Sequence, residues 1–223
     1  MKALIAWSGG KDAAWALHLA RQQGIEVAGL LTTTAAGRVA MHEVRGALVE
    51  AQAAAAGLPL WTVPLPWPCP NSEYEAAMRA ALVRARKDGI DAVVFGDLFL
   101  ADIRTYREAL LARTSLEPVF PLWGKDTRAL AAEMIAQGLR ATLVCVDLAR
   151  LAARFAGRDF DPALLADLPE GCDPCGENGE FHTFVSAGPM FRAPVPIERG
   201  SVEERGGFAF ADLLPAGSPP CRS

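Results

Sequence analysis

The residue types closest to the N-terminus that could do chemistry form one short segment, Ser8-Gly9-Gly10-Lys11-Asp12. Its glycines permit positive φ and let the main chain approach an oxygen-rich ligand, so that backbone N–H groups can point at an anion. Ser8 adds a hydroxyl, Lys11 adds a mobile positive charge, and Asp12 adds a carboxylate that can hold a Mg²⁺ bridging phosphates. The spacing matches neither GxxxxGK[ST] nor GxGxxG. We therefore predict a phosphate site in which Ser8, Gly9, Gly10, Lys11 and Asp12 contact the ligand.

A second concentration of reactive side chains lies in residues 173–184, which hold carboxylates, an amide, a histidine and a hydroxyl. Glu180 and His182 are two residues apart, so in a strand their side chains would share a face. Such a pair suits the handling of an amine or the orientation of a carboxyl group. We predict catalytic roles for Glu180 and His182, together with Lys11. The predicted substrate contacts are Glu177, Asn178, Glu180, His182 and Thr183.

A third candidate is Gly96-Asp97, which directly follows the apolar run 91–95. In an open α/β sheet, ligands bind outside the carboxyl ends of the strands, so Asp97 is aimed at the same crevice as the phosphate site. Asp97 is then a second magnesium or nucleotide contact, with Asp12 as the other metal ligand. A turn or helix-cap aspartate is the plainer interpretation.

The elements that must position these residues follow an alternating pattern. Apolar runs of strand length occupy 3–7, 27–34, 60–63, 91–95 and 141–146. Helical segments are expected at 12–23, 43–56, 73–87, 103–112 and 127–137, the third of them capped by Ser72. Strands that alternate with helices predict an α/β fold with a parallel sheet, to which 141–146 would contribute the fifth strand.

The character of the chain changes after residue 147. A short helical stretch near 149–155 precedes a segment rich in Pro, Gly, Asp and Glu, and short β-like pieces follow. We predict two domains, a nucleotide-binding domain at 1–147 and a smaller mixed α+β domain at 148–223.

Composition limits the class of protein. The 223 residues are 51% hydrophobic and carry a net charge of −4, which favours a globular protein and disfavours nucleic acid as partner. No apolar stretch reaches 18 residues and no cleavage site follows the N-terminus, so we expect a cytoplasmic protein without a membrane partner. The odd number of cysteines, five, favours reduced thiols.

Three of these segments carry a resemblance to known families. The N-terminal segment is similar to the pyrophosphate loop SGGxDS of N-type ATP pyrophosphatases, with Ala13 where that pattern has serine. Together with Gly96-Asp97 and the GENGEFHT segment at 176–183, it resembles the diphthine–ammonia ligase family, the ATP-binding-domain-4 group of adenine nucleotide alpha hydrolase-like proteins. The similarity covers nearly the whole chain. It implies a Rossmann-like (HUP-type) sheet with helices on both faces that binds ATP, and a smaller C-terminal domain beside the acceptor.

The resemblance also implies a reaction. In that family ATP adenylates a carboxylate, pyrophosphate leaves, and ammonia displaces AMP to form an amide. The implied ligands are ATP, Mg²⁺, ammonia or another amine, and a carboxylate acceptor on a small molecule or a protein side chain. The family's known acceptor is diphthine, a modified histidine of translation elongation factor 2. The acceptor of the present chain stays open.

Other interpretations remain. Cys172-x-x-Cys175 with His182 could indicate zinc or redox chemistry, and zinc would require Cys145 or Cys221 as a further ligand. A pyrophosphatase that thiolates tRNA would need a catalytic cysteine near the loop, for which Cys175 is the candidate. A nucleotide sensor without catalysis is a third class. Turnover of ATP to AMP, binding alone, and cysteine-dependent turnover distinguish the three.

Overall fold

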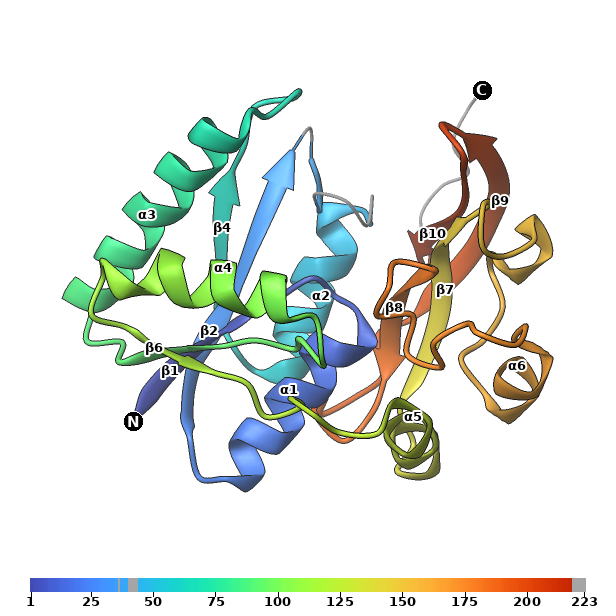
Figure 1. The fold of residues 1–223 in the computed structure, drawn as a ribbon, viewed down its shortest axis with the longest axis horizontal. Helices are drawn as coiled ribbons and strands as arrows, with labels where there is room; N and C mark the ends of the chain where they lie inside the picture. The colour runs from blue at the N-terminus through green and yellow to red at the C-terminus, as the bar shows by residue number, and fades with distance from the viewer. Residues whose placement is uncertain (36, 40–43, 218–223) are drawn as a thin grey trace.

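Two β-sheets organise the computed structural model, which describes residues 1–35, 37–39 and 44–217 (Figure 1). The strands of the first sheet are β1 (Lys2–Ala6), β2 (Glu26–Ala35), β3 (Arg38–Val39), β4 (Leu60–Pro64), β5 (Ala92–Val94) and β6 (Glu117–Val119). Their order is β3-β2-β1-β5-β6, and β4 also pairs with β2. All pairs are parallel except the short β2–β3 ladder. The predicted parallel α/β sheet is confirmed.

Both faces of the parallel sheet are buried, because successive side chains of a strand point to opposite faces. In β1, Ala3 and Ile5 join one hydrophobic core and Leu4 joins the other. The near-continuous apolar runs that predicted these strands are typical of sheets covered on both sides.

Four helices provide the covering layers. They are α1 (Lys11–Gln22), α2 (Gly46–Ala56), α3 (Asn71–Lys87) and α4 (Ala101–Ala112). Met78 and Leu82 of α3 and Leu111 of α4 pack against Leu4 in one core, whereas Trp15 of α1 and Leu48 of α2 belong to the other. Helices therefore cover both faces, as expected, and α1 and α2 lie between the two sheets (Figure 1).

The second sheet is antiparallel. Its strands are β7 (Arg140–Asp147), β8 (Phe181–Ala187), β9 (Ile197–Arg205) and β10 (Phe208–Pro215), in the order β8-β7-β10-β9. The run 141–146 was predicted as the fifth parallel strand, and this was wrong, since β7 pairs with β8 and β10. An apolar run shows that a strand is buried but not which sheet it joins. The last parallel strand is instead β6, whose three residues include a proline suited to a sheet edge.

Smaller corrections concern helix ends. Pro70 is the residue before α3, and no side chain caps the helix there. The predicted cap, Ser72, lies instead in the first turn of the helix. The stretch 149–155 forms a turn followed by the 3₁₀ helix η1 (Ala153–Phe155). Two further helices are α5 (Thr127–Ala136) and α6 (Pro162–Asp167). The predicted helix start at residue 43 lies outside the described residues.

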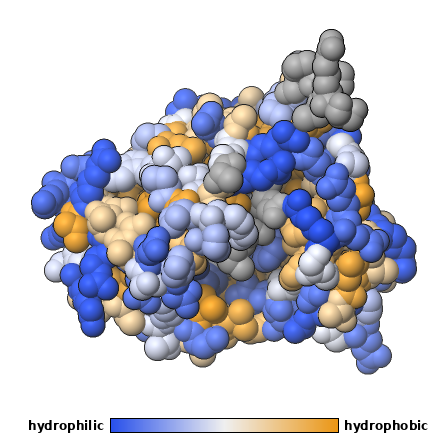
Figure 2. All heavy atoms as spheres, turned by 90° about the horizontal axis from the view of Figure 1, so that it is seen from above, coloured by the Kyte–Doolittle hydropathy of each residue, from blue (hydrophilic) through white to orange (hydrophobic). Residues whose placement is uncertain are grey.

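The larger hydrophobic core runs from the parallel sheet through α1 and α2 into the second sheet. The division of the chain after residue 147 stays a prediction. On the face seen from above, hydrophilic residues surround hydrophobic ones that lie in separate patches (Figure 2). Within the part of the chain that the structure describes, no helix is long and apolar enough to cross a membrane.

Candidate functional site

The predicted phosphate loop connects β1 to α1. Gly9 adopts a left-handed φ of 81°, and Gly10 immediately precedes α1. The Ser8 hydroxyl accepts a hydrogen bond of 3.3 Å from the Gly10 amide and so shapes the turn. The dipole of α1 favours an anion at this end of the helix, although the amide of Lys11, the first residue of α1, donates to Thr183.

Gly96 allows the neighbouring strand end to approach the loop closely. A Cβ atom placed on Gly96 would lie 2.7 Å from the backbone carbon of Asp12 and 2.9 Å from the amide nitrogen of Ala13. Only glycine fits there without movement of the backbone, so Gly96 belongs to the site through packing.

We expect Gly96→Ala to force the end of β5 away from the loop. Steric overpacking of this kind costs roughly 1–3 kcal/mol of stability, and displacement of the loop should weaken ATP binding by at least about tenfold. Thermal unfolding and calorimetric titration with Mg·ATP check both effects. Unchanged ATP affinity would show that the loop tolerates the displacement.

The second motif contacts the phosphate loop directly. The amide of Lys11 donates to the Thr183 hydroxyl across 3.0 Å, and the amide of Val185 donates to the Gly9 carbonyl across 2.9 Å. Thr183 thus provides a hydrogen-bond acceptor for the first turn of α1 from another sheet. Two segments more than 160 residues apart in the sequence form one site.

Lys11 is buried between these segments, with 2% of its surface exposed. Its ammonium donates to Asp12 Oδ2 at 2.8 Å and to the carbonyl oxygen of Cys175, and it lies over the rings of Phe160 and Phe181. Burial is the largest single influence and lowers the pKa of Lys11, but the charge and hydrogen bond of Asp12, together with Cys175 and Glu177, outweigh it, so that the pKa of Lys11 is raised. The expectation of a mobile positive charge was therefore wrong, because the ion pair and the carbonyl hold the ammonium inside the site.

The predicted metal ligands, Asp12 and Asp97, are both partly buried. Burial raises the pKa of Asp12 against the effect of Lys11, and Asp12 Oδ1 is buried with no hydrogen-bond partner in the described chain. Burial also raises the pKa of Asp97, whose carboxylate lies 3.8 Å from the Arg107 guanidinium. Among the described residues, no group of three or more His, Cys, Asp or Glu could hold a metal alone. Carboxylate oxygens such as the unpartnered Asp12 Oδ1 are of the type that Mg²⁺ binds in proteins.

Glu177 comes close to this cluster. Its Oε1 accepts a 2.8 Å hydrogen bond from the amide of Leu98. Burial raises the pKa of Glu177 to about 7, and the charges of Asp12 and Asp97 act in the same direction. A carboxyl group that titrates near neutral pH is suited to accept a proton during catalysis.

Glu180 has a different environment from the one expected. It lies just before β8 and is 1% exposed, and its Oε1 accepts bonds of 3.1 Å from the Asp173 amide and the Asn178 side chain. The expectation that Glu180 and His182 share a strand face was wrong, because the chain is still in the turn at Glu180. The buried Glu180 carboxylate holds this turn together.

His182 lies in β8, opposite Cys145. Burial, with a further contribution from the positive charge of Lys11, lowers the pKa of His182 to about 4. The imidazole is consequently neutral at physiological pH, and it is a weaker base than Glu177.

Burial keeps the thiols of Cys172 and Cys175 protonated. Cys172 and Cys175 are free thiols, and burial raises their pKa to about 11 and about 12. The Cys175 thiol donates to the carbonyl of Thr127 at 3.4 Å. Cys221 lies outside the described residues. Neither Cys172 nor Cys175 has the lowered pKa of a nucleophilic thiol.

Gln52 is a residue of the site that the sequence analysis missed. It lies on α2, is fully buried, and its carboxamide donates to the Gly9 carbonyl at 3.0 Å. A glutamine within an alanine-rich helix was the available signal.

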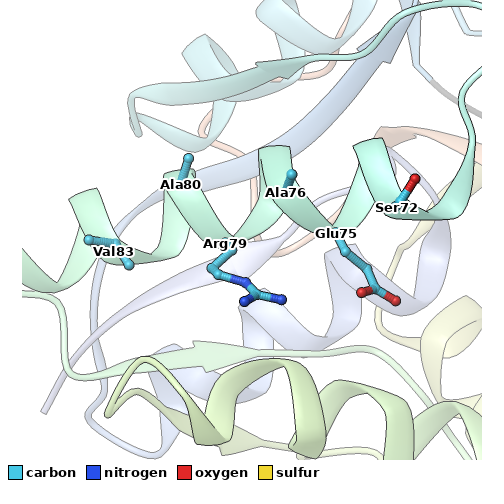
Figure 3. Close-up of a pocket in the computed structure, with 6 residues that line it drawn as sticks. All are labelled: Ser72, Glu75, Ala76, Arg79, Ala80 and Val83. Carbon is cyan, nitrogen blue, oxygen red and sulfur yellow. The ribbon is translucent and has the colours of Figure 1, made fainter.

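A separate hollow of about 530 Å³ lies on the surface of α3 (Figure 3). It is lined by Ser72, Glu75, Ala76, Arg79, Ala80 and Val83. None of the predicted site residues lines it.

Comparison with known proteins covers both motifs. Residues 1–117 match the diphthamide synthase N-terminal domain, and residues 126–210 match the diphthamide synthase C-terminal domain. A diphthine–ammonia ligase of Danio rerio is 28% identical over 230 residues, which cover 92% of this chain and 90% of the relative. The Bos taurus ligase is 25% identical over 231 residues, covering 92% and 86%. The phosphate loop falls in the first matched domain, and β7 and residues 173–184 fall in the second.

A solved structure from Methanocaldococcus jannaschii, named as a predicted subunit of tRNA methyltransferase, covers 85% of this chain and 98% of its own. Its sequence identity is 16% and its TM-score is 0.45. A likeness of that size supports no inference about RNA.

Proposed function

The chain belongs to the diphthamide synthase family, and on that premise we propose that it is an ATP-dependent ligase which joins ammonia or another amine to an acceptor carboxylate. The products besides the amide are AMP and pyrophosphate. The observation that supports the proposal most is the hydrogen bonding between the phosphate loop and β8, because it brings the groups suited to ATP and to an acceptor into one site. Such proximity accelerates a reaction between two bound molecules.

The phosphate loop would hold the departing pyrophosphate. Ser8, Gly9 and Gly10 present the turn and the first amides of α1, and Lys11 adds charge where charge builds up on the leaving group. Asp12 and Asp97 would hold Mg²⁺, which supplies further neutralisation of the phosphates when it is bound.

The turn and β8 would receive the acceptor and the amine. We assign the proton of the attacking ammonium to Glu177, because its pKa lies nearer that of ammonium than the pKa of His182 does. Neutral His182 then serves as a hydrogen-bonding contact to the substrate. Glu180 and Asn178 keep the turn in the shape that presents Glu177, and Thr183 ties β8 to the loop.

The proposal is tested by incubation with ATP, Mg²⁺ and ammonia. Elongation factor 2 carrying diphthine is the first acceptor, and a panel of small carboxylates follows. Phosphorus NMR should show AMP and pyrophosphate that depend on the acceptor. ADP and phosphate as main products would contradict the proposal, and ATP binding without turnover for every acceptor would favour a nucleotide sensor.

The tRNA-thiolation alternative predicts cysteine-dependent turnover, and we expect the opposite. Because a thiol with a pKa of about 12 is protonated at neutral pH, Cys175→Ala should leave AMP release within about threefold of the wild type. Cys69→Ala provides a control outside the site. Loss of turnover in Cys175→Ala with ATP affinity intact would favour thiolation.

A further inference from the structure

The carboxamide of Gln52 connects three segments behind the phosphate loop. Its Nε2 donates to the Gly9 carbonyl at 3.0 Å and to the Val185 carbonyl at 2.7 Å, and its Oε1 accepts from the Trp7 indole at 3.0 Å. Both amide hydrogens and the amide oxygen therefore have partners. The opposite orientation of the amide would place an NH₂ group against the indole N–H, so the contacts fix one orientation.

These bonds act on the part of the loop with the least common backbone conformation. Gly9 has a φ of 81°, and a Cβ atom there would lie 2.9 Å from Gln52 Oε1. The carboxamide thus packs against the glycine as well as bonding to its carbonyl. Gly9 has little room to leave this conformation while Gln52 remains in place.

The same carboxamide also binds the strand of the second motif. Val185 follows Thr183 by two residues on β8, and its amide donates to the Gly9 carbonyl that Gln52 also binds. The Gly9 and Val185 carbonyls both accept from the Gln52 amide. Without that donor the buried Val185 carbonyl loses its Gln52 partner, and the Gly9 carbonyl keeps only the bond from the Val185 amide. A buried polar group that loses its partner is costly, so the loop and β8 would shift relative to each other.

We propose that Gln52 is a positioning residue that sets the phosphate loop and β8 in register, so that ATP and the acceptor are aligned for reaction. The inference rests on the proposed function and adds to it the group that couples the two halves of the site. Gln52 contacts neither the side chains predicted to bind phosphate nor those predicted to bind the acceptor. It acts through the backbone of Gly9 and Val185.

The test uses Gln52→Met, which keeps the length of the side chain and removes its hydrogen bonds. Affinity for a non-hydrolysable ATP analogue with Mg²⁺ should fall about tenfold, and AMP release at saturating ATP should fall about 100-fold, because small displacements of reacting groups have large effects. Val49→Ala is the matched control, since Val49 is buried on the same helix. It should lower the thermal midpoint and leave both values within about twofold, at a temperature far below every midpoint.

The outcomes distinguish failure of the positioning role of Gln52 from failure of the proposed function. If the wild type binds the analogue and Gln52→Met binds it equally well, with an unchanged rate, the positioning role is overturned and the proposed function stands. If the wild type does not bind the analogue, the proposed function fails and this inference fails with it. If Gln52→Met does not fold, Trp7→Phe replaces it in the test. This variant removes the hydrogen bond from the indole to Gln52 Oε1, and it should lower the rate of AMP release about threefold. An unchanged rate in Trp7→Phe would then overturn the inference.

Discussion

Lys11→Ala should weaken Mg·ATP binding by about 10- to 150-fold, because it removes the buried positive charge beside the loop, and a charge-assisted interaction contributes roughly 1.5–3 kcal/mol. AMP release should fall by a further factor of about 10²–10³, since charge on the departing pyrophosphate is largest in the transition state. The variant also leaves the partly buried Asp12 carboxylate without its ion pair. Calorimetric titration and the rate of AMP formation measure the two effects.

Two further variants distinguish the effect of the Lys11 charge from the effect of the size of its side chain and from the loss of any lysine. Lys11→Arg keeps the charge, but the guanidinium is too large for the slot between Asp12 and the Cys175 carbonyl, so partial activity at most is expected. Lys125→Ala removes an exposed lysine and should change neither value. ATP affinity in Lys11→Ala equal to that of the wild type would exclude the loop as the phosphate site.

Much of the fold was accessible from the sequence, for a physical reason. Strands of a sheet covered on both faces are apolar throughout, and most of the helices between them end at glycines, so the elements of the first 112 residues could be predicted apart from the two-residue β3. The assignment of β7 failed because its partners β8 and β10 lie far along the chain. β6 was missed because a three-residue edge strand with a proline leaves no periodic pattern.

The arrangement of the candidate site was predictable from the sequence to about the same extent as the fold. Residue types and spacing indicated the phosphate loop and the segment 173–184, and the structure brings them together. Spacing could not show that Lys11 is held inside an ion pair, or that Glu180 is used within its own turn. Gln52 was missed because two of its three partners are backbone groups, those of Gly9 and Val185, which no pattern of side chains reveals.

Glu177→Gln should reduce amide formation by about 10²–10⁴, the usual effect of removing a positioned base. Glutamine keeps the oxygen that accepts the bond from the Leu98 amide, so the turn is preserved. Burial raises the pKa of Glu177 to about 7 in the folded protein, so its ionisation opposes folding progressively as the pH rises from the group's ordinary pKa to about 7. The variant should therefore be at least as stable as the wild type above pH 7, and ATP affinity should be nearly unchanged.

The dependence of the rate on pH gives the sharpest measurement. With total ammonium fixed between pH 6 and 8, the wild-type rate should rise and then level off above about pH 7, as Glu177 becomes ionised and able to take a proton from bound ammonium. Glu177→Gln can use only free ammonia, whose concentration increases about tenfold per pH unit in this range. Its rate should increase throughout without levelling.

Asp12 and Asp97 also face this carboxyl group with raised pKa values, and they remain in the variant, so any titration seen in both proteins belongs to them. A levelling near pH 7 in both proteins would assign the proton transfer to another group, and loss of ATP affinity together with stability would give Glu177 a purely structural role.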